Sequence, residues 1–109
     1  YRLTSSRDFA RLHAQGQSCK NNQVVLITLA NGLSYSRFGF SLSRKLGNAV
    51  TRNRCKRLLR EVVRLNLVNI KPGYDVLFIA RKGMLNATYQ ATERAVLELL
   101  GLAGALNIE

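Results

Sequence analysis

Acidic side chains are scarce in this sequence, which holds six Asp and Glu against 17 Lys and Arg, with one His and two Cys. We find no paired carboxylates, no CxxC pair and no His–Cys dyad among these few residues. General acid–base, nucleophilic and metal-dependent catalysis need such groups close together. The sequence therefore predicts no catalytic residues, no metal site and no protein-bound cofactor, and Cys19 and Cys55 are expected to be reduced thiols.

Long apolar runs are also missing. No stretch approaches the roughly 20 residues that a membrane-spanning helix needs, and no signal-peptide pattern is present. The chain is nevertheless 47% apolar over 109 residues, which suits one domain, residues 1–109, with a single core. We expect a cytoplasmic protein with no membrane contact.

Positive charge is what the sequence has in excess, with a formal net charge of +11. Eight of the 17 cations lie between Arg44 and Arg64. Like charges on adjacent helical turns destabilise a helix by about 0.2 to 0.5 kcal/mol per pair, so their concentration indicates an anionic partner. Nucleic acid is the first candidate and an anionic membrane surface the second.

The segment Lys45–Arg64 is expected to form a two-sided helix that begins near Asn48. At about 100° per residue, the cationic arc and the apolar stripe fall on opposite sides. The arc holds Arg52, Asn53, Lys56, Arg57, Arg60 and Arg64, and the stripe holds Cys55, Leu58, Leu59 and Val62. The stripe should pack on a core, and the guanidinium groups of the arc match phosphate. DNA and RNA both stay open on this ground.

Periodicity and capping residues predict six elements around this helix. They are a helix over 6–15, strands over Gln23–Ala30 and Arg37–Ser43 that form a hairpin, the basic helix to about 66–69, a central strand over Tyr74–Ala80 buried on both faces, and a helix from about Thr88. This order predicts an α/β sandwich around a small mixed sheet.

The strand Arg37–Ser43 alternates strictly. Phe38, Phe40 and Leu42 share one face, whereas Gly39, Ser41 and Ser43 share the other. We expect the bulky face to pack on the core and the bare face to form a shallow floor that is open to a ligand.

Two common nucleic-acid-binding modules do not fit. A helix-turn-helix domain needs a short helix directly before its recognition helix, where this sequence predicts a hairpin. An RNA recognition motif needs exposed aromatic residues in two signature strands, and RFGFSLS and YDVLFIA do not match that requirement.

The run RFGFSLSRKLGNAVTRNRCKRLLREVVR resembles the signature of the bacterial ribonuclease P protein subunit, whose RNR motif matches Arg52-Asn53-Arg54. Agreement extends through SSRDF, QVVLITL and YDVLFIARKG and covers nearly the whole chain. The resemblance implies an α+β fold: a two-layer α/β sandwich in the order αββαβα with a small mixed central sheet, of the ribosomal protein S5 domain 2-like type. It also implies a left-handed βαβ crossover, against the usual right-handed rule.

The resemblance further implies the protein subunit of an endoribonuclease that removes the 5′ leader of precursor tRNA. In that family the RNA subunit holds the active site and its Mg²⁺ ions, so the protein alone is implied to be non-catalytic. Its partners would be ribonuclease P RNA and precursor tRNA, with the protein a monomer within the ribonucleoprotein. A stand-alone RNA-binding or ribosomal-protein-like module stays open as the alternative, and an autonomous nuclease is disfavoured by the missing catalytic groups.

Site residues are carried over from the family by matching positions. The RNA-subunit contacts are expected at Arg44, Lys45, Asn48, Arg52, Asn53, Arg54, Lys56, Arg57, Arg60 and Arg64. A cleft for the single-stranded leader is expected at Phe9, Arg11, His13, Val25, Ile27 and Ser41, with additional RNA contacts at Arg81 and Lys82.

The chain departs from the family pattern in this cleft. His13 stands where a second Phe is common, and Ile27 stands where an aromatic residue can occur. A core role for Phe9 and a plain exposed role for His13 therefore stay open.

Overall fold

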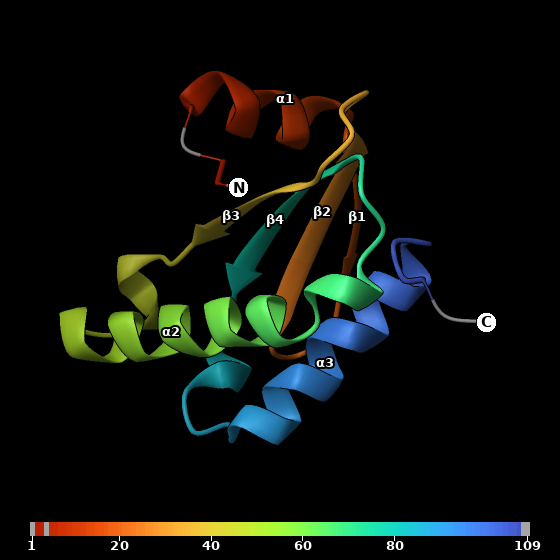
Figure 1. Cartoon of the computed structure of the whole chain (residues 1–109). Helices are drawn as coiled ribbons and strands as arrows, with labels where there is room; N and C mark the ends of the chain where they lie inside the picture. The colour runs from red at the N-terminus through yellow and green to blue at the C-terminus, as the bar shows by residue number, and fades with distance from the viewer. Residues whose placement is uncertain (1, 4, 108–109) are drawn as a thin grey trace.

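The computed structural model describes residues 2–3 and 5–107 as one four-stranded sheet with helices on both of its faces (Figure 1). The elements are α1 (Ser6–Gln15), β1 (Gln17–Lys20), β2 (Val24–Ala30), β3 (Arg37–Ser41), η1 (Arg44–Leu46), α2 (Ala49–Leu65), η2 (Leu67–Asn69), β4 (Tyr74–Ala80), η3 (Lys82–Met84) and α3 (Tyr89–Leu102). The expected α+β class and the mixed sheet are confirmed.

The strand order is β1-β2-β4-β3, with β4 antiparallel to β2 and parallel to β3. The predicted hairpin between β2 and β3 is therefore wrong, because β4 lies between these two strands. Val76, Leu77 and Phe78 of β4 are at most 1% exposed, because α1 covers one face of the strand and α2 and α3 cover the other. The left hand of the β3–α2–β4 crossover stays a prediction.

The hairpin that does form joins β1 to β2, and β1 is not among the strands predicted from the sequence. Its residues, QSCK, are mostly exposed and pair with β2 from Gln17 opposite Thr28 to Lys20 opposite Val25. The Asn21 side chain closes the turn by accepting hydrogen bonds from the backbone N–H groups of Gln23 and Val24, both at 3.0 Å. A short polar edge strand has no hydrophobic alternation, so its pairing is visible only in three dimensions.

The main core lies between the sheet and helices α2 and α3. The predicted apolar stripe of α2 enters it, with Cys55, Leu59 and Val62 at most 1% exposed. Opposite them, the rings of Phe40 and Phe78 stack with centroids 5.4 Å apart. The stripe therefore fixes which side of α2 faces solvent.

Helix α1 crosses the other face of the sheet (Figure 1) over a second cluster, formed by Leu3, Leu12, Ile27 and Leu77. Gly39 permits this close packing, because a Cβ atom there would lie 2.9 Å from Cε1 of Phe9 and 3.0 Å from Cβ of Leu3. The bare face of β3 is thus not an open floor at Gly39, as expected from the sequence, but is covered by the chain's own side chains.

A buried carboxylate joins α1 to the sheet. Asp75 of β4 is 0% exposed and accepts hydrogen bonds from four donor groups. Arg11 of α1 donates at 2.7 Å, Arg37 of β3 donates from Nε at 2.8 Å and from a terminal nitrogen at 2.7 Å, and Asn31 donates at 2.9 Å. Burial alone raises the pKa of Asp75, but the hydrogen bonds from Arg37 and Asn31 and the nearby positive charges outweigh it, so the pKa lies below its usual value.

We expect Asp75→Asn to lower the free energy of unfolding at pH 7 by about 3 to 5 kcal/mol, because two buried guanidinium contacts lose their carboxylate. The folded chain holds Asp75 more acidic than the unfolded chain does. Its contribution is therefore complete above the ordinary Asp pKa of about 3.9 and is lost as the pH falls through the lower folded value. Urea unfolding at several pH values measures the difference, which should shrink in acid.

The matched control for this prediction is Asp8→Asn, since Asp8 is partly exposed and lies 3.6 Å from Arg37. This variant should lose much less stability. Equal losses from the two variants would contradict the assignment of Asp75 as the anchor.

Candidate nucleic-acid interface

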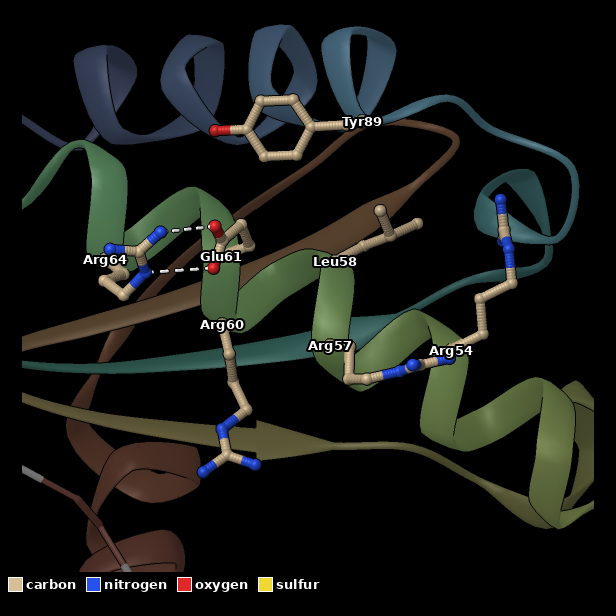
Figure 2. A pocket seen from close by; sticks show the side chains of 7 residues that line it. All are labelled: Arg54, Arg57, Leu58, Arg60, Glu61, Arg64 and Tyr89. Carbon is tan, nitrogen blue, oxygen red and sulfur yellow. Dashed lines mark hydrogen bonds and ion pairs between the residues drawn. The ribbon is translucent and has the colours of Figure 1, made fainter.

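The solvent side of α2 carries a band of cations. Asn53, Arg57, Arg60 and Arg64 are exposed and Arg52 and Lys56 are half-buried, all on the side opposite the apolar stripe. The band has little acid to neutralise it, because Glu61 is the only acidic residue of α2. Arg57 and Arg60 extend from the helix with no bond to the other side chains drawn (Figure 2). The predicted cationic arc is therefore present as a surface.

The start of α2 is fixed by Asn48, one of the residues expected to bind RNA. Its side-chain oxygen accepts a hydrogen bond from the backbone N–H of Thr51 at 2.9 Å. This is an N-cap, which stabilises the helix that presents the cations.

The arginines of α2 are not equivalent. Arg54 donates to the backbone oxygens of Leu85 at 3.3 Å and Ala87 at 2.7 Å, so it ties α2 to the segment before α3. Arg64 forms a two-point ion pair with Glu61, at 3.0 and 2.5 Å. This hydrogen bonding lowers the pKa of Glu61 and raises that of Arg64. Arg57 and Arg60 have no such internal partner in the part of the chain that the structure describes.

The RNR motif thus divides between two sides of α2. Arg52 and Asn53 line a hollow at the edge of β3 together with Phe40 and Lys56. The Nε atom of Arg52 is buried there and has no hydrogen-bond partner among residues 2–3 and 5–107. Arg54, in contrast, reaches the loop before α3.

A second basic hollow lies beside the segment that leads into α2. Lys45 of η1 lines it from one side, and Arg81 and Lys82 line it from the other, after the end of β4. Arg81 also donates to the backbone oxygen of Asn21 at 2.6 Å. Arg44 is exposed next to Lys45. The structure therefore brings together two cation pairs that the sequence offered separately.

The residues of the expected leader cleft lie on the face that α1 crosses, with different exposures. Val25 and Ser41 are both in register with Ile79 of β4, so these three form one row across β2, β4 and β3. Val25 and Ile79 are half-buried and Ser41 is exposed. The sequence missed Ile79 because β4 was expected to be buried throughout.

The other residues of this set are on or beneath α1. Phe9 is half-buried against Gly39, and His13 follows it by one turn and is exposed. Ile27 is only 6% exposed, and Arg11 is bound to Asp75. Ile27 and Arg11 therefore support this face, while Phe9 and His13 lie where a ligand could contact them.

Neither a metal site nor a membrane-spanning helix is found in the described residues. Within residues 2–3 and 5–107, no group of three or more His, Cys, Asp or Glu is placed to hold a metal ion. No helix in the described residues has the length and apolar character to cross a membrane.

Fold and surface together define the class: a small basic α+β domain, with a cationic helix on one side of a mixed sheet and a half-exposed apolar row on the other, as nucleic-acid-binding domains have. Comparisons with known proteins agree. The family model Ribonuclease P matches residues 1–104. The ribonuclease P protein component of Alkaliphilus oremlandii is 39% identical, over 97% of this chain and 93% of its own length.

Solved structures give the same result. The RNase P protein of Staphylococcus aureus matches with a TM-score of 0.90 at 34% identity, over 98% of each chain. A mutant of the S. aureus protein, described as defective in mRNA degradation activity, matches equally well over 96% of this chain and 89% of its own. The chain belongs to the ribonuclease P protein family, the protein components of this endoribonuclease.

Substitutions at two neighbouring arginines, Arg54 and Arg57, should have different effects, one on folding stability and the other on RNA binding. Arg54→Ala should lower the free energy of unfolding by about 1 to 3 kcal/mol, because two backbone oxygens lose a charged donor. Arg57→Ala should leave stability nearly unchanged, since Arg57 is exposed. It should instead reduce the slope of log affinity against log salt for RNA by about one. Urea unfolding and filter binding over a salt series measure the two effects, and the reverse pattern would contradict the assigned roles.

Proposed function

We propose that this chain binds the catalytic RNA of ribonuclease P through α2 and assists that RNA in removing the 5′ leader of precursor tRNA. The observation that carries the proposal is the two-sided α2. Its apolar stripe is locked into the core, so Arg57 and Arg60 are held toward solvent with no internal partner in the described residues. Guanidinium groups presented in this way match phosphate oxygens.

The second part of the proposal places the leader on the α1 face. The row Val25–Ile79–Ser41 offers apolar surface next to Phe9, and a stacked base gains roughly 1 to 3 kcal/mol on an aromatic ring. Arg81 follows Ile79 by two residues, so the basic hollow lies one step further along the same strands. A single-stranded RNA leader bound along this row would place a base on Phe9 and its phosphates near Lys45 and Arg81.

The chemistry in this proposal belongs to the RNA. The RNA subunit would hold the Mg²⁺ ions and supply the hydrolytic chemistry with them, and the protein would contribute binding and orientation. The protein acts as a monomer within a cytoplasmic ribonucleoprotein. A stand-alone RNA-binding module is the alternative, and it would bind RNA without restoring processing.

Reconstitution tests the proposal directly. Precursor tRNA should stay intact with the protein alone and should be cut at the mature 5′ end, at low Mg²⁺, when the protein is added to a bacterial ribonuclease P RNA. The experiment with the protein alone should include an mRNA substrate, because a mutant of the S. aureus relative is described as defective in mRNA degradation activity. Cleavage of either substrate without added RNA would overturn the non-catalytic role, and no stimulation of the RNA would favour the alternative.

The leader surface has its own test. Phe9→Ala should reduce the preference of the reconstituted complex for precursor over mature tRNA by roughly 1 to 3 kcal/mol, because one stacking ring is lost. Affinity for the RNA subunit should be unchanged, since α2 is on the other face. Leu33→Ala, a change at an exposed leucine in the β2–β3 loop, is the control. Equal losses for both tRNAs would assign Phe9 a purely structural role.

A further inference from the structure

A groove between α2 and the first turn of α3 borders the cationic band of α2, and its floor has no role in the two surfaces described so far. Arg54, Arg57, Leu58, Arg60, Glu61 and Arg64 line it from α2, and Tyr89 lines it from α3 (Figure 2). Tyr89 is not among the predicted site residues, and Leu58 is predicted to face the core. In the structure Leu58 is only partly buried, so its side chain contributes to the groove.

Tyr89 offers its ring to the groove rather than its hydroxyl. The hydroxyl donates to Oε2 of Glu93 at 3.0 Å, and the same oxygen accepts from the side-chain amide of Asn66 at 2.8 Å. The ring lies across from Leu58 and Glu61 in Figure 2. A ring whose hydroxyl is already bonded within the protein can bind a partner mainly through its aromatic face.

The charges around this aromatic floor are strongly one-sided, with four arginines against one glutamate. Two of the arginines are occupied, because Arg54 is bonded to backbone oxygens and Arg64 to Glu61. Arg57 and Arg60 remain, one extending along the groove and the other away from Tyr89 (Figure 2). Both line the groove from α2, so the phosphates that flank a base on Tyr89 would lie along the α2 side of the floor.

We propose that this groove binds one unpaired nucleotide of ribonuclease P RNA, with its base on Tyr89 and Leu58 and its flanking phosphates on Arg57 and Arg60. The inference rests on the proposed function, since it names a further contact to the same RNA. Charge complementarity selects the ligand: a nucleotide combines the flat π face and the phosphates that this pairing of aromatic floor and arginines accommodates.

The sequence contains no tryptophan, so a tryptophan introduced in the groove serves as a fluorescent probe without background from other indoles. The Tyr89→Trp variant has a single indole there, and stacking of a base should quench its fluorescence when a bacterial ribonuclease P RNA is added at low salt. The matched control is Leu102→Trp, at the far end of the same helix, where the leucine is 72% exposed. Its fluorescence should change little. Equal signals from the two variants would overturn the proposal.

Affinity gives the second measurement. Tyr89→Leu should weaken binding of ribonuclease P RNA by roughly 5- to 150-fold with an unchanged salt slope, because a stacking contact and no phosphate contact is lost. Tyr89→Phe should bind like the wild type, since it removes only the hydroxyl. A loss as large for Tyr89→Phe as for Tyr89→Leu would overturn the stacking role. If Tyr89→Leu does not fold, the fluorescence comparison decides.

Arginine variants distinguish failure of the groove proposal from failure of the proposed function on which it rests. Arg57→Gln should lower the salt slope by about one whether or not a base stacks on Tyr89. Weaker binding by Arg57→Gln with normal binding by Tyr89→Leu would refute the groove and keep the proposed function. Normal binding by both variants, and by Arg60→Gln, would refute the proposed function itself.

Discussion

The arrangement of this domain depends on one buried carboxylate. Asp75 lies at 0% exposure in a central strand and accepts hydrogen bonds from α1, β3 and the segment after β2, each at least 38 residues from Asp75 in the sequence. A buried carboxylate is costly unless it is paired and hydrogen-bonded, and this one has both kinds of partner. Its partners therefore fix α1 against the sheet. With α1 in place, Phe9 sits on Gly39 and the row Val25–Ile79–Ser41 stays partly open.

Helix α2 shows how one cationic sequence can serve several purposes. Arg54 holds the loop before α3, Arg64 pairs with Glu61, and Arg57 and Arg60 extend toward solvent. A helical projection separates the cations from the core, but it cannot tell which of them find internal partners. The partners of Arg54 are backbone oxygens of Leu85 and Ala87, between η3 and α3, whose positions depend on the tertiary fold. Glu61, the partner of Arg64, is a local one, three residues away on α2. A phosphate-binding surface assigned from charge alone thus includes residues that hold the protein together.

The limits of prediction from sequence follow the same division between local and distant interactions. The starts of the helices are predicted to within about a residue, because the cap residues Ser5, Asn48 and Thr88 and the apolar periodicity are local signals. The predicted end of α2, at about 66–69, lies beyond its observed end at Leu65. The predicted hairpin is wrong and β1 has no signal in the sequence, because strand pairing is made by backbone hydrogen bonds between segments that can be far apart in the chain. Asp75 stands within an apolar run and Tyr89 at a helix start, and neither position carries a local signal of its role. The roles of both depend on partners elsewhere in the chain.

The five residues of β3 connect the two surfaces in the proposed function. Phe38 and Phe40 point into the core beneath α2, whereas Gly39 and Ser41 face α1, so one strand backs both sides. A catalytic RNA held on α2 and a leader held on the α1 face would then be separated by a single, fully packed sheet. Because packed interiors deform little, the distance between the two RNAs would be set by the fold. A protein without catalytic groups can accelerate a reaction in this way, by holding two reactants in a fixed relation.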